Sequence, residues 1–412
     1  MKAPALFTIL LWLFFSTSAL VSQRNEPCLA SQLRQEWWNR DAENYRQWQQ
    51  QNRQIREWLQ SKPGIIHRGQ VITIPVVVHI VWNSPEENLS DAEILSQIDA
   101  LNRDFRALND EVADIPFVFK SLVADVELEF CLAGTDPDGQ PTNGITRTFT
   151  NNDIGIGGTS AIHYSALGGK DAWDPSKYLN IWVAKFAGGV SGTSSFPGQG
   201  PPEEDGVEIN YRFFGTLAAE PPYNLGRTLT HEVGHYFNLE HPWGPNVTDC
   251  CQDDFVADTP EACETYLGQC PVHPVVSCDE PDMFMNYMFY TDDACMAMFT
   301  LGQKARMLAA LSLFRSGLLN AGSCATATTE NIAEGKNVLY PNPASSVLHI
   351  QADAKFNGAG EYIIFDVMGR EVQAGTLGDG VSSIDVEGLR PGYYTLQLLN
   401  DGEVLSAHFL KH

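Results

Sequence analysis

Three histidines and one glutamate stand close together in the sequence, at spacings that suit metal chemistry. His231 and His235 are four residues apart in a segment expected to be helical, so both imidazoles lie on one helical face. That spacing lets two ring nitrogens reach one zinc ion at about 2.1 Å. Glu232, next to His231, can take a proton from an activated water and later give it to a leaving amine.

A third ligand is predicted at His241, six residues after His235. A straight helix would place His241 on another face, so the chain must bend near residue 238. Asn238 suits that bend, because Asn tolerates the left-handed backbone conformation better than any residue except Gly. The alternative is three unrelated histidines, and with 10 His in 412 residues this pattern arises by chance in on the order of one chain in a few thousand.

The elements around this motif predict an α+β domain. The helix with the histidines is expected to begin near Leu225, and a second helix is expected after the capping box that Ser90 and Glu93 form. Alternating or β-branched runs predict strands at Val71–Trp82, Val126–Leu132, Leu179–Lys185 and Gly206–Asn210. Strands mixed with two long helices are typical of α+β folds.

The N-terminal residues read as export and regulatory segments. A positive charge at Lys2, an apolar run and small residues predict a signal peptide over residues 1–22, against the alternative of a buried first helix. One long amphipathic helix is expected over residues 31–60. We interpret residues 23–69 as a pro-segment, although an integral N-terminal helix of the mature protein is left open.

The C-terminal residues form a separate unit. A small, polar stretch predicts a linker over residues 323–337, after a main domain of residues 70–322. Residues 338–412 carry short alternating runs that predict a small β-sandwich. The expected strands are Val347–Gln351, Tyr362–Val367, Ser382–Val386, Tyr393–Leu399 and Glu403–Phe409.

Composition excludes several classes of partner. The formal net charge of −25 argues against nucleic-acid backbones and anionic membranes. After the first 22 residues no apolar stretch is long enough for a membrane helix, so no transmembrane segment is expected in the mature form. Nine cysteines in an exported chain predict disulfides, with at least one thiol left over.

The chain resembles the pappalysin (M43) branch of the metzincin zinc proteases, of ulilysin and mirolysin type. Besides the histidine motif, the resemblance covers about residues 70–320 and includes the runs Ile74–His79, Leu101–Phe105, Phe130–Ala133, Asn180–Val183, Phe196–Gly198, Asp258–Pro260 and Thr291–Met296. It implies a catalytic domain with a twisted mixed sheet, a backing helix, an active-site helix and an irregular, disulfide-rich lower subdomain. Its partners would be protein or peptide substrates. Most metzincins have Gly where this chain has Asn238.

The resemblance also assigns residues beyond the histidines. Asn286–Tyr290 matches the Met-turn, in which Met288 would lie as a hydrophobic floor under the metal. Tyr290 would donate its hydroxyl to the oxyanion of the tetrahedral intermediate or act as an extra ligand. Asp293 occupies the place at which some relatives select Arg or Lys directly after the scissile bond (P1′). The substrate would add a strand to the sheet edge near Val190–Pro197.

Family members bind structural calcium, and an oxygen-rich run suits such a site here. Asp254, Asp258, Thr259 and Glu261 offer the carboxylate and hydroxyl oxygens that calcium prefers. The alternative is a solvated acidic loop.

The resemblance further implies a disulfide pattern. It pairs Cys278 with Cys295, and Cys250, or adjacent Cys251, with Cys270. Cys263 would take the remaining cysteine of the 250/251 pair, and the partners of Cys131 and Cys324 stay open.

Relatives keep themselves latent with a pro-segment cysteine whose thiolate occupies the metal position later used by water. Cys28 is the only candidate here, and a thiolate is a good zinc ligand. The usual flanking Arg and Gly-Thr are replaced by Pro27 and Leu29-Ala30. A Cys28–Cys324 disulfide is the alternative.

Residues 338–412 resemble the type IX secretion sorting domain of Bacteroidota, which implies a secretion-machinery partner and a place outside the cell or at its surface. An adhesive or carbohydrate-binding sandwich is the alternative. For the whole chain the expectation is therefore a secreted zinc endopeptidase. A catalytically inactive protease fold used for binding is its competitor, and a zinc hydrolase acting on other amides is a third hypothesis.

Overall fold

The computed structural model describes most of the chain in two folded units. It covers residues 27–62, 69, 71–152, 161–186, 189–246, 251–320, 324, 338–340, 344–351, 360–366, 370–377, 383–400 and 403–411. The predicted signal peptide lies outside these residues, as does the predicted linker apart from Cys324.

The larger unit is built on a twisted mixed sheet with strand order β2-β1-β4-β6-β5, and β3 also pairs with β1. All pairs are parallel except β5 with β6, and β5 lies at the edge of the sheet. The strands are β1 (Ile72–Trp82), β2 (Leu128–Leu132), β3 (Ile145–Phe149), β4 (Leu179–Ala184), β5 (Gly192–Ser194) and β6 (Val207–Asn210). The edge strand falls within Val190–Pro197, as predicted.

Alternation along β1 divides the core into two layers. Ile74, Val76, Val78 and Ile80 face the helices and belong to the main hydrophobic cluster. Val77 and Val81 face the opposite side and pack in separate, smaller clusters under the loops. Because β1 is buried on both faces, its sequence is an almost continuous apolar run.

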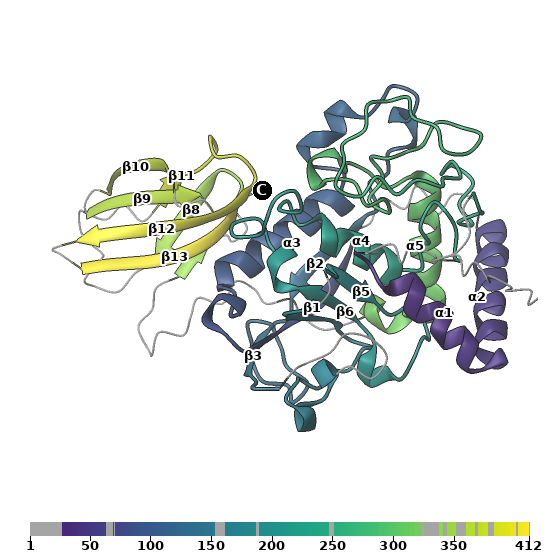
Figure 1. Cartoon of the computed structure of the whole chain (residues 1–412). Helices are drawn as coiled ribbons and strands as arrows, with labels where there is room; N and C mark the ends of the chain where they lie inside the picture. The colour runs from purple at the N-terminus through teal and green to yellow at the C-terminus, as the bar shows by residue number, and fades with distance from the viewer. Residues whose placement is uncertain are drawn as a thin grey trace, which may run out of the picture.

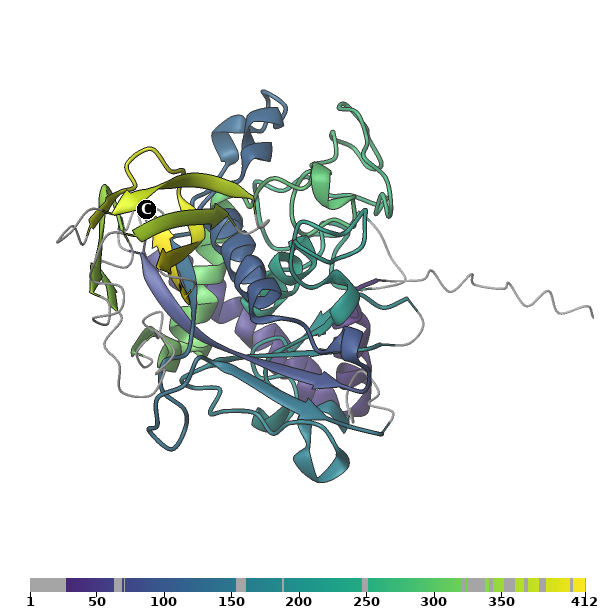
Figure 2. The same cartoon turned by 90° about the vertical axis from the view of Figure 1, so that its left-hand side faces the viewer.

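In its described residues the larger unit has five α-helices. They are α1 (Ala30–Arg40), α2 (Ala42–Ser61), α3 (Asp91–Phe105), α4 (Arg227–Tyr236) and α5 (Leu301–Phe314). Of these, α3, α4 and α5 contribute side chains to the main hydrophobic cluster on the sheet. The Ser90 hydroxyl caps α3 by accepting from the Glu93 amide at 3.1 Å, as the capping pattern predicted. In Figure 2 α3 (blue) and α5 (green) lie on the same side of the sheet.

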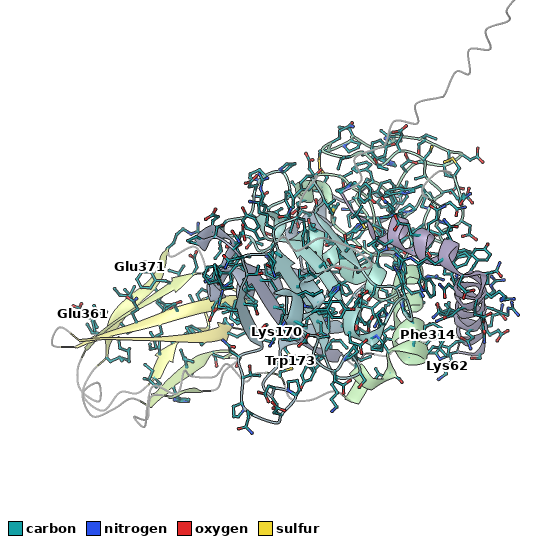
Figure 3. All side chains as sticks on the ribbon, turned by 60° about the horizontal axis from the view of Figure 1, so that its bottom comes forward. Lys62, Lys170, Trp173, Phe314, Glu361 and Glu371 are labelled. Carbon is teal, nitrogen blue, oxygen red and sulfur yellow. A yellow bond between two sulfur atoms is a disulfide. The ribbon has the colours of Figure 1, made fainter. Side chains whose placement is uncertain are left out.

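The predicted single helix over residues 31–60 is wrong, because the chain breaks at Asp41. Asp41 has an extended backbone and its carboxylate caps α2 by accepting from the Glu43 amide at 2.8 Å. The break lets the two helices follow different paths. Helix α1 approaches β5, whereas α2 lies along α5 (Figure 1). Figure 3 labels the neighbouring ends of that second pair, at Lys62 and Phe314.

The C-terminal unit consists of two antiparallel sheets packed on a common core, as a β-sandwich requires. Their strands are β7 (Val338–Tyr340), β8 (Val347–Gln351), β9 (Gly360–Asp366), β10 (Glu371–Leu377), β11 (Ser383–Asp385), β12 (Gly392–Asn400) and β13 (Glu403–Lys411). All five predicted strands are present. Strands β7 and β10 were not predicted. In Figure 3 the labels Glu361 and Glu371 mark the pair β9 and β10. No helix among the described residues is long and apolar enough to span a membrane.

Disulfides join Cys131 to Cys324, Cys251 to Cys278 and Cys270 to Cys295. The predicted pairs Cys250–Cys270 and Cys278–Cys295 are therefore wrong, and Cys250 itself lies outside the described residues. A backbone hydrogen bond from the Asp292 amide to the Gln269 carbonyl, 3.1 Å long, brings Cys295 beside Cys270. The Cys28–Cys324 alternative is also wrong, because Cys324 is bonded to Cys131.

Candidate active site

The side chains of His231, His235 and His241 converge on one point. Their three Nε2 atoms are 3.1, 3.1 and 3.2 Å apart, and all three rings are buried. Ligands at about 2.0–2.1 Å from a tetrahedral zinc ion are about 3.3 Å from one another. The predicted triad is therefore assembled in a spacing that fits this ion.

Hydrogen bonds on the far side of two rings fix which nitrogen carries the proton. The Nδ1–H of His231 donates to the Tyr287 carbonyl and that of His235 to the Leu239 carbonyl, each at 2.7 Å. A carbonyl only accepts, so each Nε2 presents a lone pair to the other ring. Lone pairs facing at 3.1 Å repel unless a cation lies between them. This donor set therefore fits a metal ion.

Burial also keeps the three rings neutral, the form that binds metal. It lowers the pKa of His231 to about 4 and holds the pKa of His235 and of His241 well below the usual value.

The bend that brings His241 back to the metal lies at Asn238, as predicted. Its φ is +74°, in the left-handed region. The buried Arg306 side chain holds the turn, since its Nε donates to the Asn238 carbonyl at 2.7 Å and its Nη2 to Asn238 Oδ1 at 2.6 Å. Asn therefore makes the turn and also takes part in its support.

Helix α4 is attached to α3 by a buried polar network. Arg227 forms an ion pair with Asp104, and the Thr230 hydroxyl donates to the other oxygen of the same carboxylate at 2.6 Å. The Arg227 guanidinium also reaches Glu111 at 2.8 Å. These contacts fix the first turns of α4, and with them the direction of His231 and Glu232.

Met288 lies directly beneath the active-site helix. A Cβ added to Gly234 would come within 2.6 Å of the Met288 sulfur, so only glycine at position 234 lets the helix approach this closely. Met288 is fully buried, and its amide donates to Asn286 Oδ1 at 3.0 Å. Met288 therefore packs against the helix that carries His231 and His235, and its role as the floor of a metal site stays a prediction.

Two aromatic side chains enclose His241. The Tyr290 hydroxyl lies 3.0 Å from His241 Nε2, next to the point on which the three rings converge. The Trp243 ring stacks on the imidazole with centroids 4.5 Å apart and planes inclined by 13°. Tyr290 is close enough for the ligand or oxyanion role that was predicted for it.

Glu232 is buried beside the three rings, and burial raises the pKa of its carboxyl to about 8. One oxygen, Oε2, has no hydrogen-bond partner among the residues that the structure describes, and a hydrogen bond with the Cys28 thiol opposes the pKa rise. A buried carboxylate with an unfilled oxygen is poised to accept a proton from a group entering the site.

Cys28 joins the histidine cluster. Its Sγ and one nitrogen of each of His231, His235 and His241 all lie within 4.8 Å of one another, and this is the one such group of potential ligands in the described part of the chain. Backbone contacts hold Cys28 there. The Ser191 amide donates to the Pro27 carbonyl at 2.7 Å, and the Leu29 amide to the Gly192 carbonyl at 3.2 Å.

Asp293 belongs to the short 3₁₀ turn Asp293–Cys295, and its side chain contacts the backbone at the N-terminal end of α4. Its Oδ2 accepts from the Leu225 amide at 2.7 Å and from the Arg227 amide at 3.3 Å. Its Oδ1 is buried without a hydrogen-bond partner among the described residues. Burial raises the pKa of this carboxyl to about 7.

The residues predicted for calcium do not converge. Asp258 accepts from the Thr300 hydroxyl at 2.6 Å and the Gly302 amide at 2.9 Å, at the beginning of α5. Asp254 is buried and accepts from the Thr259 hydroxyl at 2.6 Å, whereas Glu261 is exposed. The carboxylates thus serve two separate local structures.

Several residues of the site had no signal in the sequence. The Ser31 hydroxyl lies 3.1 Å from His241 Nδ1, and Arg34 forms a buried ion pair with Glu240, whose oxygens its nitrogens reach at 2.6 Å. Both come from a segment about 200 residues away in sequence. Only Trp243 and Glu240 could have been suspected, because they flank His241.

The sequence matches two family profiles. Residues 165–312 match the peptidase M43 family, described as Pregnancy-associated plasma protein-A, and residues 338–412 match a secretion system C-terminal sorting domain. Among curated proteins, an "Extracellular metalloprotease" of Pyricularia oryzae is 31% identical over 261 residues, which cover 61% of this chain and 78% of that protein. Another of Arthroderma gypseum is 31% identical over 259 residues, 60% of this chain and 74% of that protein.

Solved structures give the same result. A promirolysin variant of Tannerella forsythia with a Glu-to-Ala substitution is 38% identical, with a TM-score of 0.65 over 72% of this chain and 97% of that chain. Mature mirolysin of the same organism, in complex with a cleaved peptide, is 43% identical, with a TM-score of 0.57 over 61% of this chain and 96% of that chain.

Proposed function

This chain belongs to the pappalysin (M43) family of metalloproteases, and we propose that it is a secreted zinc endopeptidase. The zinc ion would be held by His231, His235 and His241, and Glu232 would act as the general base in the hydrolysis of the peptide bond. The family, the metalloprotease activity and the secretion sorting domain at residues 338–412 provide the premise. The single observation that carries the proposal is the convergence of three Nε2 atoms beside a buried carboxyl group.

In this mechanism the three imidazoles would hold the ion, and Glu232 would act as general base and then as general acid. A bound zinc ion supplies Lewis acidity, which polarises the scissile carbonyl and lowers the pKa of water. Glu232 accepts the proton of the attacking water and then delivers it to the leaving nitrogen. The Tyr290 hydroxyl, 3.0 Å from His241 Nε2, is placed to donate to the oxyanion.

We also propose that Asp293 selects Arg or Lys at P1′. Its buried Oδ1 lacks a partner among the described residues, so an incoming cation would satisfy a carboxylate oxygen that is costly to leave unpaired.

We propose further that residues 23–69 are a pro-segment that covers the histidine cluster. Two observations support this proposal: Cys28 pairs with Gly192 of β5, where a substrate strand would pair, and its sulfur lies within 4.8 Å of a nitrogen of each of the three histidines. A Cys28→Ala zymogen should then show activity before processing, whereas an equally latent variant would remove the switch.

We keep a structural calcium ion near Asp254 as a proposal from the family resemblance, although the described residues offer there one buried carboxylate rather than a converged set of ligands. Loss of thermal stability on calcium-selective chelation is the expected result, and indifference would remove the site.

The test of the function is a peptide-library digest by the processed protein, with and without a zinc chelator. Internal cleavage that the chelator abolishes, with Arg or Lys enriched at P1′, is expected. A Glu232→Ala protein that still hydrolyses casein would refute the general-base role, and a flat P1′ profile would remove Asp293 from specificity.

A further inference from the structure

The guanidinium of Arg34 is held in a formed recess of the larger unit. Its Nη1 and Nη2 each donate to one oxygen of Glu240 at 2.6 Å, in a bidentate pair. The guanidinium lies over the Phe196 ring, with its Cζ atom 3.8 Å from the ring centroid, and Nη2 is 3.4 Å from the Pro245 carbonyl oxygen. Arg34 is 1% exposed, so water is almost excluded from its ion pair with Glu240.

The recess belongs to the catalytic part of the chain rather than to the N-terminal segment. Glu240 directly precedes the ligand His241, and Phe196 follows the edge strand β5. Phe196 also packs against the ring of His235, with centroids 5.2 Å apart. From the N-terminal segment itself, the Trp38 ring lies 4.8 Å from the guanidinium carbon of Arg34. Removal of residues up to 69 would therefore empty the recess without removing its walls.

Among the described residues, Arg34 is the one cation that hydrogen-bonds to Glu240. Arg306 attracts Glu240 electrostatically, but its Nε donates to the Asn238 carbonyl and its Nη2 to Asn238 Oδ1 and Asn52 Oδ1. Asn52 belongs to the N-terminal segment, whereas the two bonds to Asn238 lie within the catalytic part of the chain. Without Arg34 the Glu240 carboxylate, which directly precedes the ligand His241, would lose its bidentate partner. A carboxylate in that state binds a cation from solution or from a substrate.

We propose that Arg34 occupies a guanidinium subsite with which the mature protease holds an arginine side chain of its substrate. The inference rests on the proposed endopeptidase function. Two parallel N–H···O bonds and a stacked aromatic face match the planar arginine fork, whereas a lysine ammonium can satisfy only part of them.

The subsite is separate from Asp293. Asp293 contacts the amides that begin α4, whereas Glu240 lies beyond the end of that helix at Tyr236. Cys28 pairs with Gly192 in the parallel sense, so residues after Cys28 run toward Phe196. A substrate strand antiparallel to β5 would bring residues N-terminal to its scissile bond to the same recess. The preferred arginine is therefore on the non-primed side.

The test uses the processed protein and paired peptides that differ only in Arg or citrulline at each non-primed position. Citrulline keeps the shape of the arginine side chain but lacks its positive charge and one of the two N–H-bearing ends that form the bidentate pair. In the wild type, kcat/KM should fall about ten- to a hundredfold for citrulline at one position. Lysine at that position should give an intermediate value. In Glu240→Gln the Arg-to-citrulline ratio should approach one.

Two further variants separate the subsite from general damage. Glu280→Gln removes the same charge from an exposed position and should keep the wild-type ratio. Phe196→Leu should reduce the preference for Arg over Lys, because it removes the stacking face. A wild type that cleaves peptides but ignores citrulline at every non-primed position overturns the subsite alone, as does an unchanged ratio in Glu240→Gln. A processed wild type that cleaves no peptide overturns the proposed function as well.

Discussion

Two stretches of the chain supply the active site, and their geometry is held in different ways. Residues 227–241, the helix region, place their ligands by one helix and one left-handed turn. Residues 251–300, the loop region, contain no α-helix in their described structure and are held by Cys251–Cys278, Cys270–Cys295 and the paired amides of Asn286 and Gln303. The first depends on local backbone geometry, and the second depends on cross-links between distant residues.

The largest expected effect isolates the chemistry of the helix region from its fold. Glu232→Gln should lower kcat by about 10²–10⁴, the usual contribution of a general base, with no loss of thermal stability. The amide fills the same volume and removes a buried ionisable group. Peptide hydrolysis and calorimetry of the same preparation measure both quantities. Unfolding at a much lower temperature would mean that Glu232 is structural.

Next in size is the effect of a cross-link in the loop region. The double variant Cys270→Ser/Cys295→Ser should lose about 3 kcal/mol of unfolding free energy, since the bond closes a loop with a sequence separation of 25. Denaturant titration under non-reducing conditions measures the change. Peptide mapping of the wild type should recover Cys270 with Cys295, and recovery of Cys270 with Cys250 would contradict the structure.

A smaller effect should appear as pH dependence of the loop region. Burial raises the pKa of Asp254 to about 7, above its unfolded value, so the stability it contributes is present at low pH and lost as pH rises through 7. Between pH 5 and pH 7 this group alone should cost about 2 kcal/mol.

Asp254→Asn should flatten that part of the stability profile, measured by denaturant titration at each pH in calcium-free buffer. Added calcium should flatten it in the wild type if the ion binds the ionised carboxylate. The contrary result is a calcium-free wild type that becomes more stable between pH 5 and pH 7, with the gain absent in Asp254→Asn. It would mean that folding lowers the pKa of Asp254 rather than raising it.

The smallest expected effect is at the turn of the helix region. Asn238→Ala and Asn238→Gly both remove the side-chain hydrogen bond from Arg306, but only glycine adopts a φ of +74° without strain. The alanine variant should therefore be less stable by about 1 kcal/mol. Equal unfolding free energies for the two variants would show that the turn relaxes.

The same contrast explains how much could be predicted from the sequence. The spacing of His231 and His235 predicts that both rings lie on one face, because a helix has a fixed period. Asn238 predicts the bend, because Asn tolerates the left-handed backbone conformation. The cysteine pairs could not be derived in this way, because Cys270 meets Cys295 only through the path of the intervening loop. Resemblance gave the wrong pairs for that region.

Long-range contacts set the other limits. Nothing in the sequence near residue 34 indicates that Arg34 reaches Glu240, 206 residues away. Asp41, read as part of a continuous helix, ends one helix and caps the next because its side chain competes for the backbone amide of Glu43. In the C-terminal sandwich, β10 was missed because Glu371–Leu377 alternates weakly and exposes most of its side chains.

The most direct test of the zinc site is a zinc titration of the metal-stripped, processed protein with peptide hydrolysis as the readout. Activity should be absent at the start, rise linearly with added zinc and level off at about one equivalent. A His235→Ala protein should stay inactive throughout. Full activity in the stripped protein, or an unchanged titration in His235→Ala, would contradict catalysis by a zinc ion held at His231, His235 and His241.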